Sequence, residues 1–110
     1  MLIDALHSGN RLAMAASALV ECLVGPARRG DAAIRTVRDL VARLPISIIP
    51  VEEAIATTAA RLRAAHRSLR LPDALVIAAA LEHSADQLVT TDRRWPTTKA
   101  LKFKGTLKHL

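Results

Sequence analysis

One long apolar run stands out from the pattern of hydrophobic and polar positions along the chain. Residues 74–81 (ALVIAAAL) carry no polar side chain, and Pro72 and Asp73 precede them. Proline at the first helical position with an acid in the first turn is a helix-start signal. The run is too long for a typical strand, too short to span a bilayer, and has no polar face. It therefore predicts a buried helix in a layered fold, leading into a short buried strand at residues 87–90.

The rest of the pattern predicts helices that alternate with strands. Further strands are expected at residues 11–15, 46–49 and, weakly, 100–103. Further helices are expected to finish within residues 1–10 and to span residues 16–24, 32–44 and 51–69. Strands separated by helices favour a parallel sheet covered on both faces, which is a three-layer α/β/α fold.

Local signals set the expected ends of the early helices. Ser17 is a plausible N-cap for the helix at 16–24, and Gly25 with Pro26 is expected to end it. Asp31 is expected to cap the helix that follows.

Composition describes one small domain over residues 1–110, with 51% hydrophobic residues for a core. The core must be aliphatic, because Trp95 and Phe103 are the only aromatic residues. The single cysteine, Cys22, excludes an internal disulfide and is expected to be a small buried hydrophobe. No segment predicts a membrane span or a signal peptide, so we expect a cytoplasmic protein.

The chain is strongly basic, with a formal net charge of +6 and a pI near 10.7. Such a balance suits a polyanionic partner, RNA or DNA, or an acidic protein; ordinary surface charge that supports solubility is the alternative. No aromatic residues interleave with the lysines and arginines, which argues against stacking recognition of single strands.

Three acids occupy positions that call for an explanation. Glu21 lies in the apolar segment ASALVECLV, where a buried carboxylate must reach a cation, a hydrogen-bonding network or a cleft. Asp73 opens the apolar helix, and Asp92 follows the strand at 87–90, where α/β folds carry their chemistry. Plainer interpretations stay open: an exposed glutamate at a helix margin, a helix N-cap, and a turn residue.

Converging carboxylates without a cysteine–histidine cluster favour a hard divalent cation, magnesium or manganese, over zinc. In two-metal phosphodiester sites such ions activate water and stabilise the leaving oxygen. Surface positive charge around an acidic metal pocket is the layout that hydrolysis of a nucleic acid requires.

Three motifs in this order resemble the PIN domain, and in particular the VapC-type toxins of bacterial toxin–antitoxin pairs. The family shows S-x-x-x-E, then P-D-A-x-I-A-A-x-A, then L-x-T-x-D at a strand end. The matching positions here are Ser17 and Glu21, residues 72–81, and Leu88, Thr90 and Asp92. The match covers essentially all of residues 1–110.

The resemblance implies a magnesium- or manganese-dependent ribonuclease that a small cognate antitoxin inhibits and that is usually a homodimer. It implies that Glu21, Asp73 and Asp92 are catalytic and metal-binding acids. By the same resemblance, Thr90 is a polar neighbour that orients the site, and Ser17 supports it.

The chain departs from the family at its beginning. The family opens with a central strand whose aspartate is a principal metal ligand, and no such stretch precedes residue 1 here. Asp4 is the only early acid, and MLIDALHSG aligns better with the helix before the second strand. We therefore expect an N-terminally truncated PIN-like fold without the first strand and helix. Three explanations stay open: a start that lies upstream, a decayed copy, or another segment that fills the gap.

Three functions follow. The leading one is an endoribonuclease toxin that hydrolyses RNA phosphodiester bonds through metal-activated water. The alternative is a catalytically impaired PIN remnant that only binds RNA or an antitoxin. A weaker third is a plain α/β interaction module in which the acids are helix caps.

Overall fold

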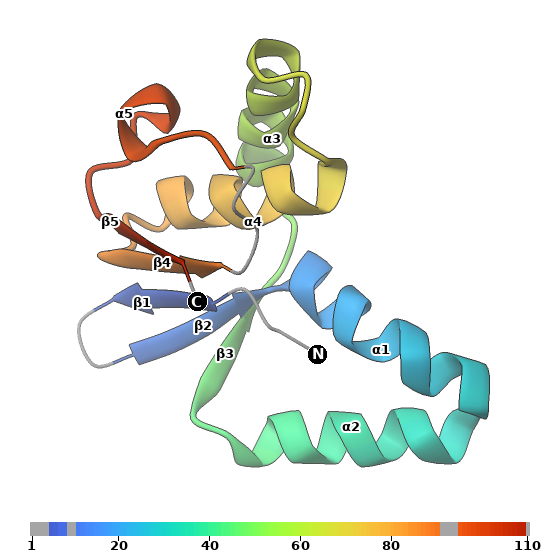
Figure 1. Cartoon of the computed structure of the whole chain (residues 1–110). Helices are drawn as coiled ribbons and strands as arrows, with labels where there is room; N and C mark the ends of the chain where they lie inside the picture. Colours follow the sequence, from blue (N-terminus) through green and yellow to red (C-terminus); the bar gives the residue numbers. More distant parts are fainter. Residues whose placement is uncertain (1–4, 9–10, 91–94, 110) are drawn as a thin grey trace.

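A five-stranded sheet organises the fold in the computed structural model, which describes residues 5–8, 11–90 and 95–109 (Figure 1). The strands are β1 (Ala5–Ser8), β2 (Arg11–Ala15), β3 (Ile46–Ile49), β4 (Gln87–Thr90) and β5 (Thr106–His109). Their order across the sheet is β3-β2-β1-β4-β5. The β2–β3 and β4–β5 pairs are parallel, whereas β1 runs antiparallel to both of its neighbours.

Five helices accompany the sheet in the described part of the chain. They are α1 (Ala16–Arg29), α2 (Asp31–Arg43), α3 (Glu53–Ala65), α4 (Leu71–Glu82) and the short α5 (Thr98–Leu101). In Figure 1, α3, α4 and α5 gather at the top of the view, and α1 and α2 extend away from them at the lower right. The expected α/β architecture is confirmed. None of the helices in the described residues is long and apolar enough to cross a membrane.

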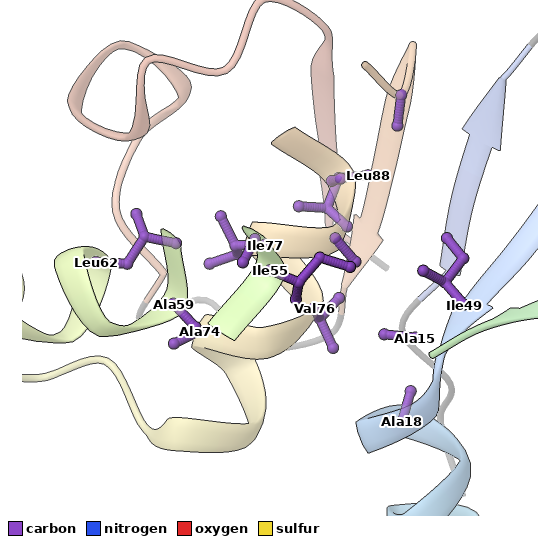
Figure 2. Packing of buried hydrophobic residues seen from close by; sticks show 14 of the residues in the cluster. Ala15, Ala18, Ile49, Ile55, Ala59, Leu62, Ala74, Val76, Ile77 and Leu88 are labelled. Atoms are coloured by element: carbon purple, nitrogen blue, oxygen red, sulfur yellow. The ribbon is translucent and has the colours of Figure 1, made fainter. Parts of the chain in front are cut away.

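The α4 helix is buried around its whole circumference, as its apolar run predicts. Residues 73, 74 and 76–80 are all buried, and Ile77 has no exposed surface. Figure 2 shows Ile55, Ala59 and Leu62 of α3 gathered beside Ala74 and Ile77 of α4. Burying a side chain such as Ile77 stabilises the fold by about 1.5–3 kcal/mol, so this contact anchors the position of α4.

The first strand overturns the expectation that residues 1–10 finish a helix. Residues 5–8 form β1, which lies between β2 and β4 in the middle of the sheet. Leu6 pairs with Ala13 on one side and with Leu88 on the other. Gly9–Asn10 between two strands is a hairpin signal as much as a helix stop. The sheet is therefore mixed rather than wholly parallel. The expected absence of the family's first strand and helix stays a prediction.

The α1 helix is longer than expected and ends differently. It continues through Gly25 and Pro26 to Arg29 and stops at Gly30, whose φ of 115° and ψ of 178° are open only to glycine. Pro26 is buried inside the helix. The expectation that Gly25 and Pro26 end the helix was therefore wrong: α1 accommodates Pro26 at a buried position, although a proline inside a helix forfeits one backbone hydrogen bond.

Three other boundaries differ from the expected ones. The N-cap of α2 is Gly30, so Asp31 is the first helical residue rather than the cap. The α3 helix is shorter than the expected 51–69, since it starts at Glu53 and ends at Ala65. The expected strand at 100–103 is wrong: Thr97 accepts a hydrogen bond from Ala100 N at 3.2 Å and starts α5 there.

Candidate functional site

Asp73 lies in the first turn of α4 and is buried, with 8% of its surface exposed. The N-cap of this helix is Arg70, so the N-cap interpretation of Asp73 is wrong. Arg70 Nε lies 3.7 Å from Asp73 Oδ2, and the arginine side chain is mostly exposed. The amino end of a helix favours a carboxylate electrostatically, whereas an exposed arginine partner contributes little. The sequence therefore places a buried carboxylate in the first turn of a helix.

Ser17 ties α1 to this turn. Its hydroxyl Oγ donates to the carbonyl oxygen of Pro72, the residue before Asp73, across 3.5 Å. The distance is at the long limit of a hydrogen bond, so the contact orients more than it stabilises. The expected capping role of Ser17 is wrong, because Ala15 is the N-cap of α1 and makes no side-chain cap bond.

Glu21 lies one turn after Ser17, and residues four apart share a helix face. The structure exposes Glu21, so the expectation of a carboxylate buried among apolar neighbours is wrong. The same part of α1 leaves Val20 60% exposed and Val24 42% exposed. An apolar segment does not reveal which of its faces the fold covers, and here one face is left open.

Glu21 and Ser17 line a groove of about 290 Å³ between α1 and the start of α4. The other lining residues are apolar: Ala16, Val20, Val51, Leu71, Pro72 and Leu75. Glu21 is the only charged residue among these described lining residues. Reasoning from sequence missed Val51 and Leu71 at this site. The one signal in the sequence is that each is an apolar residue next to a proline near a predicted helix start.

Thr90 is the last residue of β4 and is fully buried. It lies on the same face of the strand as the buried Leu88, and it is in register with His109 of β5. Asp92 follows two residues later and lies in residues 91–94, outside the described part of the chain. The structure therefore describes two of the three expected acids.

The polar side chains of Asp73, Glu21 and Thr90 all offer oxygen atoms, the ligand type that magnesium and manganese prefer. Within residues 5–8, 11–90 and 95–109, no three histidine, cysteine, aspartate or glutamate side chains come together as a metal-binding group. A three-acid centre thus depends on Asp92 and stays a prediction. The described acids that could take part are Asp73, which is buried in the first turn of α4, and Glu21, which lines the groove beside Pro72.

Comparison with known proteins identifies the fold. The chain is similar to a solved structure titled "Toxin-antitoxin complex from Klebsiella pneumoniae", with a TM-score of 0.61 and 24% sequence identity. The match covers 74% of this chain and 63% of that chain, so this chain spans less than two thirds of that protein's length. No curated protein matches the sequence significantly. Residues 2–101 match the family model of the PIN domain, and the chain therefore belongs to the PIN domain family.

Proposed function

We propose that this PIN domain is a metal-dependent endoribonuclease, the VapC-type toxin of a toxin–antitoxin pair. PIN domains are generally nucleases that depend on a divalent metal. The observation that carries the proposal is the buried carboxylate of Asp73 in the first turn of α4. The net charge of +6 supports a polyanionic substrate, for which we propose RNA. The expected cytoplasmic location belongs to this proposal.

In this proposal Asp73, Glu21 and Asp92 hold Mg²⁺ or Mn²⁺, which when bound supplies activated water and stabilises the leaving oxygen. Asp73 is held by the amino end of α4, where the helix dipole favours its negative charge. Ser17 orients α1 against the same turn, and Glu21 lines the groove one helical turn further along α1. Thr90 contributes a buried hydroxyl at the carboxyl end of β4.

The test is cleavage of single-stranded RNA with Mg²⁺ or Mn²⁺ by the full chain and by Asp73→Asn. We expect the substitution to lower the rate by about a hundredfold or more, because it removes the charge that attracts the metal. The matched control is Asp31→Asn, which alters an exposed aspartate in the first turn of α2. Equal rates for wild type and Asp73→Asn would refute the assignment.

We also propose that a cognate antitoxin occupies the groove between α1 and α4. Its walls expose Val20 (60%), Leu71 (54%) and Val51 (48%), an apolar surface that a partner segment could cover. A segment seated there would lie over Glu21 and beside the turn that carries Asp73. Val20→Asp should abolish binding of the antitoxin, whereas Val24→Asp, which does not line the groove, should preserve it.

A homodimer is the other proposed assembly. The α2 helix has no buried residue, and Leu40 and Leu44 are 59% and 42% exposed. Ile48 of the edge strand β3 is also exposed. Light scattering of the purified chain measures the mass, and Leu40→Glu should yield a monomer if this surface joins two copies.

One observation favours the alternative, a PIN domain that binds RNA or an antitoxin without cutting. The central strand β1 consists of Ala-Leu-His-Ser and so brings no acid into the middle of the sheet. By the family resemblance, the central strand supplies a metal-binding aspartate. RNA binding that survives Asp73→Asn, together with no cleavage by wild type under any divalent metal, would favour this alternative.

A further inference from the structure

A second hollow lies at the opposite end of β4 from the candidate acid site. It has a volume of about 500 Å³ and is lined by residues 80, 81 and 84–86 at the end of α4 and by residues 102–106. These segments lead directly into the parallel strands β4 and β5, so the hollow lies at the amino ends of both strands. Four strand residues at about 3.3 Å each separate it by about 13 Å from the carboxyl end of β4.

The backbone fixes the shape of this hollow. Thr106 N donates to Asp86 O at 2.9 Å, which joins its two walls. Gly105 approaches Asp86 so closely that a Cβ atom there would overlap the carbonyl oxygen of Asp86, and glycine is therefore required. Ser84 and Lys102 hold left-handed backbone conformations, with φ of 50° and 57°. The walls are thus organised before any ligand binds.

The side chains of the hollow suit a phosphate next to a flat apolar group. Lys102 and Lys104 bring two ammonium groups, and Asp86 is the only acid among the described lining residues, which leaves a formal charge of +1 (two minus one). Ammonium groups bind phosphate as point charges, and the hydroxyls of Ser84 and Thr106 add donors. The lining also includes three buried apolar side chains, Ala80, Ala85 and Phe103, which we call the floor of the hollow.

We propose that this hollow binds the phosphate of a nucleotide, with the base or sugar on the floor around Phe103. The nucleotide is either free or part of an RNA chain. A metal cation is a poor alternative ligand, because the hollow offers one carboxylate and two positively charged lysines. The site is separate from the acids at the other end of the sheet, and its function does not depend on RNA cleavage.

The test uses the full chain in EDTA, so that binding at a metal centre does not contribute. Adenosine 5′-monophosphate is titrated against ¹⁵N-labelled protein, with adenosine as the probe that lacks a phosphate. We expect the amide signals of Ser84, Gly105 and Thr106 to shift with the nucleotide and to stay in place with adenosine. Equal shifts with both probes, or none at these amides, would overturn the proposal.

A matched pair of variants separates the site from general surface charge. Lys102→Gln/Lys104→Gln should weaken nucleotide binding by about tenfold or more, since both ammonium groups are removed. Lys99→Gln/Lys108→Gln removes the same charge at exposed lysines that do not line the hollow, and it should change binding by less than about twofold. If Lys99→Gln/Lys108→Gln weakened binding as much as Lys102→Gln/Lys104→Gln, the binding would be nonspecific charge attraction and the proposed site would be refuted.

A second experiment, with RNA as the ligand, then shows whether the phosphate comes from RNA or from a free nucleotide. Binding of a short oligouridylate to both double variants is measured over a range of salt concentrations, again in EDTA. If RNA occupies the hollow, Lys102→Gln/Lys104→Gln should lower the logarithmic salt slope by about 0.7 for each phosphate that the protein no longer neutralises. An unchanged slope together with abolished nucleotide binding assigns the site to a free nucleotide. These binding experiments contain no divalent metal, so a failure of the chain to cleave RNA with Mg²⁺ or Mn²⁺ would refute only the proposed function and not the nucleotide site.

Discussion

The hydroxyl of Ser17 donates to the carbonyl oxygen of Pro72, and this contact joins two segments 55 residues apart in sequence. It connects the helix that carries Glu21 to the turn that carries Asp73. Without it, the two acids would be related only through the packing of α1 and α4. The contact therefore links the fold to the proposed chemistry.

Replacing Ser17 with alanine should lower the free energy of unfolding only slightly and should lower the rate of RNA cleavage more strongly. One neutral hydrogen bond contributes about 0.5–1.5 kcal/mol, and at 3.5 Å this one should fall at the low end. RNA cleavage should fall by a larger factor if Ser17 holds α1 against the Asp73 turn. Thr36→Ala is the control, because it removes an exposed bond to Ala32 O at 3.0 Å. Urea unfolding and cleavage rates measure both effects, and an equal loss of cleavage in both variants would contradict the positioning role.

The neighbouring pair Gly25 and Pro26 yields a second prediction. Glycine in a helix interior normally costs about 1 kcal/mol relative to alanine. Apart from its chain neighbours and the nearby backbone of α1, nothing lies within 4 Å of the position that a Cβ atom would take at Gly25. A proline nevertheless disfavours the helical conformation of the residue before it, because the Cβ of that residue meets the proline ring. Gly25 therefore makes the internal Pro26 tolerable.

A double-mutant cycle measured by urea unfolding checks this relationship. Gly25→Ala should gain about 1 kcal/mol of stability in a Pro26→Ala background and should lose that gain, or destabilise, in the wild-type background. The same gain in both backgrounds would show that Pro26 does not constrain residue 25.

Local sequence was sufficient for the elements whose signals are continuous. The α4 helix follows from an apolar run between Pro72 and a polar break, and β4 follows from the short apolar stretch after it. The position of Asp73 at a helix start was predictable for the same reason. Its burial depends on α4 being buried around its circumference, which the run also predicts.

Features that depend on distant neighbours were not predictable. Residues 5–8 are too short to show an alternating pattern, and their pairing with β2 and β4 determines their conformation. Glu21 is exposed because nothing in the described structure covers that face of α1, as the exposure of Val20 also shows. A helix sequence gives its apolar surface and not the partner that covers it.

Close packing of α4 against α3 yields a third prediction. Ala78 has no exposed surface, so a larger side chain there must displace its neighbours. Ala78→Leu should lower the free energy of unfolding by about 1–3 kcal/mol, the usual effect of overpacking. Ala60→Leu makes the same change at an exposed position of α3 and should stay within about 0.5 kcal/mol. Thermal unfolding of both variants measures the difference, and equal effects would contradict tight packing at α4.

The central strand β1 yields the last prediction. Leu6 is paired with Ala13 and with Leu88, so its backbone lies between two partner strands. Leu6→Pro removes the backbone N–H and cannot fit a ladder inside a sheet, which should cost about 3 kcal/mol or more.

Leu6→Ala is the control for this change, because it shortens the same side chain and keeps the N–H. The difference between the two variants in urea unfolding therefore isolates the backbone contribution. Hydrogen exchange should show the amides of residues 5–8 protected in wild type, since strands lie on both sides of β1. If Leu6→Pro and Leu6→Ala were equally stable and these amides exchanged freely, β1 would not be the strand that completes the sheet.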